Sequence, residues 1–234
     1  MTDSLPFPEP ASLVFMFGPQ ALSFNQDSFF KLRRELQEHQ GNRWLRDSIS
    51  GLASFWPVLT DDVPKLRHVE GQMLLNELST AIETGNLGNL RFPLPSVLLS
   101  PLVVVTQLLQ YVAFVKAGLP GLADRDELPS ILMEKTEVLG LCIGLLPAMA
   151  VNCASTLAQL QHLGANSVRL AMLAGALVDA EQASPGSEGS ATSLSVSWTG
   201  SETNSLEKVL AEFPEVSYLY AMGYAEDSQC LAVL

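Results

Sequence analysis

The apolar positions along the chain follow two patterns: short continuous runs, typical of buried strands, and runs at helical spacing, typical of amphipathic helices. The first continuous run covers residues 12–17 and ends at Gly18, which predicts a buried strand followed by a tight turn. A second continuous run at residues 138–141 predicts another strand. In α/β proteins the carboxyl ends of strands carry functional residues, so the turn after residue 17 is a first place to look for a site.

Helical spacing dominates between and after these two runs, and each predicted helix ends at a Gly, a Pro or a polar loop. The first four predicted helices cover residues 29–39 with Asp27 as the cap, 43–56 before Pro57, 64–84 before Gly85 and 101–116 before Gly118. An exposed connection is expected over residues 119–136, and two more helices over residues 145–162 and 167–183.

The chain changes character at a flexible, Ser- and Gly-rich loop over residues 184–193. Beyond this loop, the pattern predicts a small β-α-β-β unit. Its elements are expected at residues 194–198, 204–213, 216–222 and 229–234. Because the chain ends inside the last apolar run, this unit is expected to be incomplete at its carboxyl end.

The composition excludes several classes of protein. Apolar residues make up 47% of the chain and charged residues 16%, which excludes a disordered protein. Thirteen Lys and Arg against 25 Asp and Glu give a net charge of −12, so a nucleic-acid partner is not expected. The three cysteines match no metal-binding spacing, and their odd number argues against a disulfide scaffold. Since no signal-peptide pattern is present, the expected location is the cytoplasm.

Two uncharged stretches, residues 92–115 and 138–168, are long enough to cross a membrane. Both contain prolines and polar side chains, and neither has a flanking Lys/Arg cluster. Elements buried on several sides in α/β proteins have the same appearance, so no membrane span is expected.

The sequence Gly140-Leu141-Cys142-Ile143-Gly144 has the G-x-C-x-G pattern of a nucleophile elbow, the cysteine counterpart of the serine elbow of acyl-transferring enzymes. Small residues on both sides let the following helix pack under the strand while the Cys142 side chain projects outward. The partial positive charge at the start of that helix favours the thiolate. The backbone N–H of Ile143 is expected to point at the oxyanion of a tetrahedral intermediate.

The alternative for Cys142 is an inert cysteine, because free cysteine is among the most frequently buried residues. Cys153 and Cys230 lack flanking glycines and are expected to pack in the core. No phosphate-binding loop, dinucleotide fingerprint, zinc-protease or EF-hand motif is present, so nucleotide and metal enzymes are not expected.

Three separated blocks of sequence resemble a known family. They are LVFMFGPQ at residues 13–20, PLVVVTQLLQYVAF at 101–114 and GLCIGLLPAMAVNCAS at 140–155. Together they resemble the starter-unit acyl-carrier-protein transacylase domain of fungal non-reducing polyketide synthases. The resemblance implies an α/β, malonyl-transferase-like fold: an α/β-hydrolase-like core over residues 1–166 and a small ferredoxin-like subdomain over residues 167–234 that is C-terminally incomplete.

The resemblance also implies roles for single residues. Cys142 matches the acyl-accepting cysteine, and Gln20 matches a glutamine that helps to form the oxyanion hole. Pro19 replaces the acid of the usual F-G-D-Q pattern, which leaves the geometry of this loop open. Leu141 stands where malonyl transferases have His, which favours a starter-unit loader. Arg169 is a possible partner for a substrate carboxylate, with a solvated or interhelical arginine as the alternative.

A general base is not assigned. In the family, the partner histidine follows the small subdomain, and none of His39, His68 and His162 matches it. His162 is expected to cap the carboxyl end of a helix. Activity is therefore expected to be impaired in this chain.

The expected function is transfer of a starter acyl group from acyl-CoA or an acyl carrier protein, through a cysteinyl thioester, to a carrier-protein phosphopantetheine thiol. No tightly bound cofactor is expected, and the partners are the carrier protein and other synthase domains. The candidate docking patch for the carrier protein consists of Lys31, Arg33, Arg34, Arg43 and Arg46. A truncated non-catalytic fragment and a cysteine-dependent α/β-hydrolase remain as alternatives.

Overall fold

The computed structural model describes residues 13–19, 24–38, 40–118, 136–182, 194–199, 219–224 and 228–233. The chain divides into two compact units, Met1–Ala183 and Ser184–Leu234. The boundary expected at 166/167 falls inside a helix of the first unit, Leu157–Gln182. That helix therefore belongs to the larger unit.

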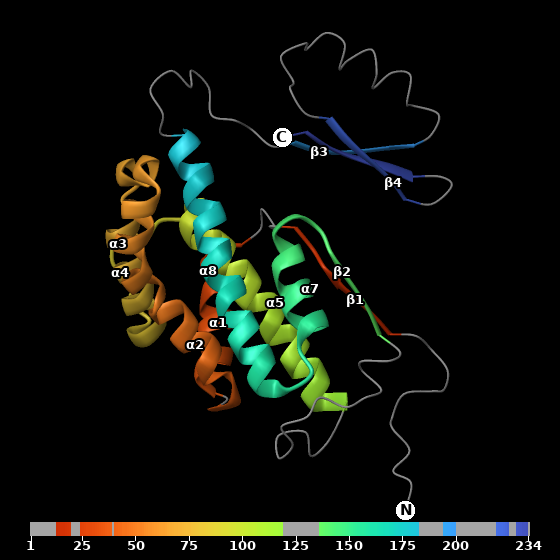
Figure 1. Ribbon diagram of the computed structural model, residues 1–234, viewed down its shortest axis with the longest axis horizontal. Coiled ribbons are helices and arrows are strands. Elements are labelled where there is room, and N and C mark those ends of the chain that lie inside the picture. The colour runs from red at the N-terminus through yellow and green to blue at the C-terminus, as the bar shows by residue number, and fades with distance from the viewer. Residues whose placement is uncertain are drawn as a thin grey trace, which may run out of the picture. The chain divides into compact units, whose positions relative to one another are not determined.

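The larger unit is an α/β structure of many helices and one pair of strands. Its elements are β1 (Leu13–Phe17), α1 (Gln26–Glu38), η1 (Gln40–Asn42), α2 (Arg43–Ser50), α3 (Leu52–Asp62), η2 (Pro64–His68), α4 (Gly71–Thr84), α5 (Ser96–Gly118), β2 (Thr136–Gly140), η4 (Cys142–Gly144), α7 (Leu145–Cys153) and α8 (Leu157–Gln182). In Figure 1, α5, α7 and α8 lie between the β1–β2 pair and the group formed by α1 to α4. Both strands confirm the positions expected from the apolar runs to within two residues.

β1 and β2 run parallel, with Leu13 opposite Thr136 and Phe17 opposite Gly140. The backbone N–H of Leu141 continues the pairing by donating to the Phe17 carbonyl oxygen at 2.9 Å. Because the strands are parallel and in this register, both carboxyl ends lie at the same edge of the sheet. This arrangement brings Gly18 beside the segment that follows β2.

One face of the strand pair packs on α5. The Phe15 ring lies edge-on to Tyr111, with the ring centroids 5.0 Å apart, and edge-on to Phe114 at 5.2 Å. Burial raises the pKa of Tyr111 to about 12, so its hydroxyl stays neutral at physiological pH. The opposite face is exposed, and it carries the apolar side chains of Val14, Met16 and Leu139 together with Glu137, which lies opposite Val14.

The core of the larger unit forms where α5 packs against α8. α8 presents a buried stripe of small residues, which lets the two helices approach closely. α5 is long and apolar enough to cross a membrane, but 72% of its most apolar window is buried inside the protein, as in a core helix. The other uncharged stretch, residues 138–168, is divided among β2, η4, α7 and the start of α8.

α5 begins at Ser96 rather than at Pro101, so the prediction of its start is wrong. The two carboxylate oxygens of Asp179 on α8 accept hydrogen bonds from the backbone N–H groups of Ser96 and Val97 at 2.9 and 2.8 Å. These donors have no partner within their own helix. A side chain distant in sequence thus caps α5, where a local residue usually does.

Pro57 lies inside α3, so the prediction that a helix ends there is also wrong. A proline has no N–H, which leaves the carbonyl oxygen four residues earlier without its helical donor. That oxygen belongs to Ala53, and it accepts a hydrogen bond from Gln72 Nε2 on α4 at 3.1 Å. The expected helix 43–56 is instead divided at Gly51, between α2 and α3.

Other helix ends follow local chemistry. Asn25, rather than Asp27, caps α1, because its Oδ1 accepts from the backbone N–H of Ser28 at 3.0 Å. Gly85 ends α4 in the left-handed conformation with φ of 80°, which confirms the expected stop. The break between α7 and α8 falls at residues 154–156 rather than between 162 and 167.

The smaller unit contains an antiparallel sheet of β3 (Leu194–Thr199), β4 (Leu219–Tyr224) and β5 (Ser228–Val233). The strand order is β3-β5-β4, so β5 is central and pairs with both others. Three strands agree with the expected unit, while its helix at residues 204–213 and the loop at 184–193 lie outside the described residues.

We expect Asp179→Ala to lower the free energy of unfolding by about 1–2 kcal/mol, because two N–H groups at the start of α5 lose their acceptor. Urea denaturation followed by circular dichroism measures this change. The matched control is Glu181→Ala on the same helix. Glu181 pairs with Lys65 at 2.6 Å, but the side chains are 68% and 51% exposed, so no shift of the midpoint is expected. Equal midpoints for the two variants would contradict the capping role.

Candidate active site

Cys142 occupies the turn between β2 and α7 in a strained backbone conformation. Its φ of 56° makes it the one residue other than glycine with positive φ among the described parts of the chain. This conformation is unfavourable for a residue with a Cβ and is typical of nucleophile elbows. The Cys142 thiol is free and the residue is exposed, so Cys142 is not a buried core cysteine.

The two glycines of the elbow are required by close backbone approaches. A Cβ on Gly140 would lie 2.6 Å from the Leu145 Cα, 2.7 Å from the Gly144 carbonyl oxygen and 2.8 Å from the Ala148 Cβ. A Cβ on Gly144 would overlap the carbonyl oxygens of Phe17 and Gly18. Gly140 therefore lets α7 fold back onto β2, and Gly144 lets the elbow rest on the end of β1.

The elbow continues directly into helical structure. Gly144 N–H donates to the Leu141 carbonyl oxygen at 3.0 Å, and the N–H of Leu145 bonds to the carbonyl oxygens of Cys142 and Ile143. The structure thus places Cys142 and the Ile143 backbone together in the first turn before α7. The side chain of Ile143 is half-buried and packs against the core.

The end of β1 lies against this turn. Gly18 is half-buried and its carbonyl oxygen accepts a hydrogen bond from Gln107 Nε2 on α5 at 2.8 Å. Pro19, which replaces the family's acid, is exposed. Gln20, the expected oxyanion-hole residue, lies outside the described residues.

Arg169 has contacts on two neighbouring groups. Its guanidinium carbon lies 4.1 Å from the centroid of the Phe55 ring on α3, and Nη1 donates to Asn166 Oδ1 at 2.9 Å. The contact with Phe55 joins α8 to α3, whereas Asn166 lies on α8 itself, so this arginine corresponds to the interhelical alternative.

The histidines and the remaining cysteines differ partly from expectation. His162 lies in the second turn of α8, near Asn166 Nδ2 at 3.3 Å, so its expected role at a helix carboxyl end is wrong. His68 is exposed at the end of η2, and His39 lies outside the described residues. Cys153 is exposed at the end of α7, so core packing is wrong for it.

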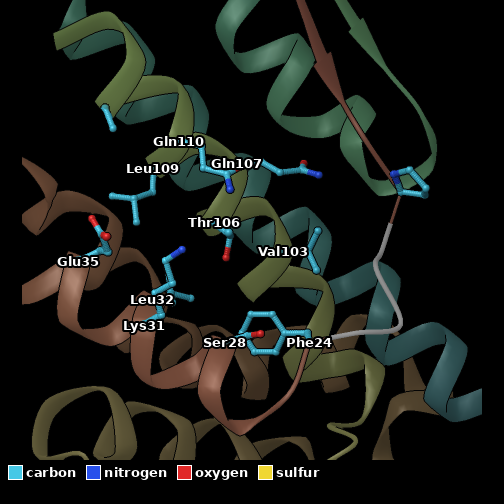
Figure 2. A pocket seen from close by; sticks show the side chains of 12 residues that line it. Phe24, Ser28, Lys31, Leu32, Glu35, Val103, Thr106, Gln107, Leu109 and Gln110 are labelled. Carbon is cyan, nitrogen blue, oxygen red and sulfur yellow. The ribbon is translucent and has the colours of Figure 1, made fainter. Parts of the chain in front are cut away.

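A cavity of about 470 Å³ opens between α1 and α5 beside the end of β1 (Figure 2). Its wall is mixed, with apolar side chains next to two amides, two hydroxyls and one charge of each sign. The lining includes Pro19, Phe24, Lys31, Leu32, Glu35 and Gln107. Sequence reasoning missed this cavity, and the available signal was the group of polar residues Thr106, Gln107 and Gln110 within an otherwise apolar helix.

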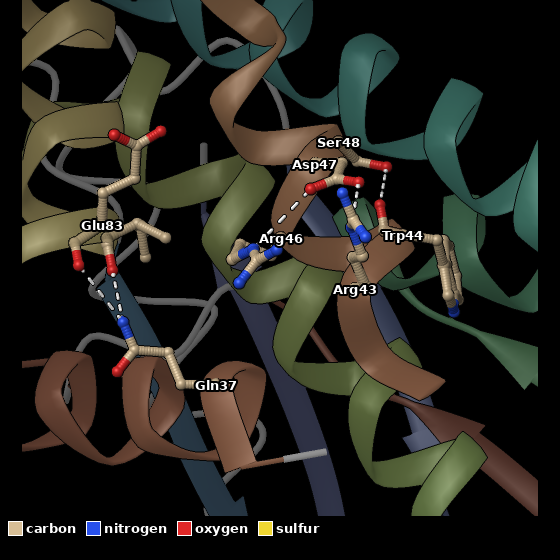
Figure 3. A network of polar contacts seen from close by, with 8 residues as sticks. Gln37, Arg43, Trp44, Arg46, Asp47, Ser48 and Glu83 are labelled. Atoms are coloured by element: carbon tan, nitrogen blue, oxygen red, sulfur yellow. Dashed lines mark hydrogen bonds and ion pairs between the residues drawn. The ribbon is translucent and has the colours of Figure 1, made fainter. Parts of the chain in front are cut away.

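The basic residues proposed for docking differ in their contacts. Arg33 Nε donates to the Ile82 carbonyl oxygen at 2.9 Å. Gln37 Nε2 donates to the same oxygen at 3.2 Å, and Figure 3 shows Gln37 directed at this end of α4. Arg43 Nε lies 3.5 Å from Asp47 Oδ2, and Arg46 Nε lies 3.6 Å from Asp47 Oδ1. Figure 3 shows both side chains directed at Asp47. Lys31 and Arg34 are exposed on α1, and Lys31 lines the cavity.

The described residues contain no candidate metal site. Within them, no three His, Cys, Asp or Glu side chains are grouped so that they could hold an ion.

Because the backbone at Cys142 is strained, we expect the glycine and alanine variants to rank in opposite orders of stability at Cys142 and at Cys153. Cys142→Gly is expected to be about 1 kcal/mol more stable than Cys142→Ala, because glycine adopts positive φ without steric cost. At Cys153, in the last turn of α7, glycine is expected to be the less stable of the two by about 0.5–1 kcal/mol. Urea titrations of the four variants test this, and the same order at both positions would argue against strain at the elbow.

The close approach of the Phe17 and Gly18 carbonyl groups to Gly144 leads to a second prediction. Gly144→Ala should cost about 2–3 kcal/mol of unfolding free energy, since the added methyl group meets backbone that cannot move aside cheaply. Gly18→Ala is the control, because a Cβ there meets nothing within 4 Å. Thermal unfolding of both variants measures the difference, and a tolerated Gly144→Ala is the contrary result.

Comparison with known proteins shows the family to which the chain belongs. The family described as "Starter unit:ACP transacylase in aflatoxin biosynthesis" matches residues 16–222. Clavatol synthase of Penicillium crustosum is 52% identical over 210 residues, which cover 89% of this chain and 8% of that protein. Citrinin polyketide synthase of Monascus ruber is 43% identical over 216 residues, which cover 92% and 8%. A non-reducing polyketide synthase of Monascus ruber is 41% identical over 209 residues, which cover 89% and 8%. This chain therefore spans about 8% of the length of these relatives and belongs to the starter unit:ACP transacylase (SAT) family.

Proposed function

We propose that this chain transfers a starter acyl group to a carrier protein through a thioester on Cys142. The observation that carries the proposal is the exposed Cys142 thiol on a strained elbow whose two glycines are enforced by backbone contacts. Strain of this kind persists only where the surrounding structure maintains it, and it is concentrated at functional sites.

The reaction consists of two matched exchanges. In the first, the Cys142 thiolate attacks the carbonyl carbon of acyl-CoA or of an acyl carrier protein. The C–S bond of the donor breaks, and the departing thiolate takes a proton. In the second, the phosphopantetheine thiolate of the acceptor attacks acyl-Cys142 and releases the Cys142 thiolate, so no oxidant or metal is required.

The oxyanion of each tetrahedral intermediate needs preorganised donors. The backbone N–H of Ile143 is one donor in this proposal, because it follows the nucleophile directly in the first turn before α7. Gln20 supplies the second donor, by the resemblance of the 13–20 segment to the family.

Proton transfer sets the relative speed of the two exchanges. The family's partner histidine has no match among His39, His68 and His162. We therefore expect acylation by a reactive thioester to exceed onward transfer, for which a base must activate the acceptor thiol.

The proposal extends to the fold and the setting of the domain. The parallel β1–β2 pair with its elbow supports a malonyl-transferase-like, α/β-hydrolase-like core, and the β3-β5-β4 sheet supports a ferredoxin-like subdomain. The relatives are named as polyketide synthases, so a carrier domain and other synthase domains are the proposed partners, in the cytoplasm. Arg169 is proposed to serve packing rather than the substrate, since its guanidinium lies on Phe55.

Incubation with a series of acyl-CoA thioesters, followed by intact-mass measurement, is expected to show the gain of one acyl group. Cys142→Ala should abolish the gain because the attacking sulfur is absent. Cys153→Ala should retain the gain of one acyl group. It is a demanding control, because Cys153 is also an exposed thiol but has no elbow around it.

Three other outcomes would contradict the proposal. Absence of any adduct indicates a non-catalytic fragment, rapid release of free acid indicates a hydrolase, and an adduct that survives in Cys142→Ala indicates nonspecific acylation.

A further inference from the structure

We propose that Gln107 is a positioning residue for the acyl transfer at Cys142 and acts through the Gly18 carbonyl group. The inference rests on the proposed function, and it concerns a residue on α5, outside the elbow and both strands.

The first observation is one long-range hydrogen bond. Gln107 Nε2 donates to the Gly18 carbonyl oxygen at 2.8 Å across a separation of 89 residues. This oxygen belongs to the peptide unit that joins Gly18 to Pro19, so the bond sets the orientation of that peptide plane. The chain leaves β1 in the direction that this plane determines.

The second observation is that the same carbonyl lies against the elbow. The oxygens of Phe17 and Gly18 occupy the space where a Gly144 Cβ would be, and the Phe17 oxygen also accepts from the Leu141 N–H at 2.9 Å. The residues on both sides of Cys142–Ile143 therefore contact the end of β1. Rotation of the Gly18 peptide would displace Gly144 and, with it, the Ile143 N–H.

The third observation indicates that the role of the Gln107 amide is to donate a hydrogen bond rather than to fill space. Gln107 Oε1 is a buried oxygen with no hydrogen-bond partner among the described residues. A buried, unsatisfied acceptor is unfavourable, and an apolar side chain of similar size would fill the same space without it. Packing alone thus does not account for a glutamine at this position in an apolar helix.

The neighbouring polar residues Thr106 and Gln110 of α5 have no such link to any other described segment of the chain. Thr106 Oγ1 donates to the Leu102 carbonyl oxygen at 2.8 Å, within its own helix. Gln110 is exposed and lines the same cavity as Gln107. Gln110 therefore offers a matched glutamine, on the same helix and at the same cavity, for control substitutions.

The test compares two reactions of the same thiol. Acylation by acyl-CoA requires the oxyanion donors to be in place, whereas alkylation by iodoacetamide, which displaces iodide without forming an oxyanion, requires only an accessible Cys142 thiolate. Both rates are read at Cys142 by peptide mass mapping of the full chain. Gln107→Met removes the donor at nearly constant volume, and Gln107→Asn keeps an amide that is one methylene too short to reach Gly18.

Both Gln107 variants are expected to be acylated about 10–100-fold more slowly than the wild type, with alkylation rates within about twofold, because misplaced oxyanion donors slow only the acyl step. Gln110→Met is expected to leave both rates unchanged. A purely structural role of Gln107 would lower the two rates together, in step with the unfolding midpoint.

The outcomes separate the two proposals. Wild-type acylation with unchanged acylation in a folded Gln107 variant overturns the positioning role and leaves the proposed function intact. Parallel loss of acylation and alkylation also overturns it. Absence of acylation in the wild type overturns the proposed function and this inference with it. Gln107→Asn retains an amide at the site, so it decides the matter if Gln107→Met does not fold.

Discussion

The carbonyl oxygens of Phe17 and Gly18 lie so close to Gly144 that no side chain fits between them, and the geometry around Cys142 depends on this contact. The contact exists because β1 and β2 pair in parallel and end at the same edge of the sheet. It places the turn after β2 directly on the end of β1. The left-handed backbone of Cys142 is then held by both strands, and the thiol is directed outward.

The parts of the structure that follow from neighbouring residues could be predicted from the sequence. Two apolar runs marked β1 and β2, and Gly85 marked the end of α4 by its tolerance of positive φ. The elbow is the clearest case. Glycines two positions before and two positions after a cysteine between a strand and a helix are a local signature, because the steric demand that they meet is itself local at Gly140.

The remaining features depend on contacts between distant segments, which a pattern along the chain does not contain. α3 passes through Pro57 because Gln72 of another helix satisfies the Ala53 carbonyl oxygen. The cavity is lined jointly by α1 and α5, which are distant in sequence, and only the polar residues of α5 hinted at it. The exposure of Cys153 depends on how α7 ends against its surroundings, which helical spacing alone does not determine.

The carboxylate of Asp179 at the start of α5 has a consequence for the order of events during translation. The acceptor for Ser96 emerges from the ribosome 83 residues after its donor. At about 5–20 residues per second, the first turn of α5 remains uncapped for roughly 4–17 s. Throughout that interval the N–H groups of Ser96 and Val97 lack the acceptor that they have in the folded protein, so this cap cannot stabilise α5 before Asp179 has been synthesised.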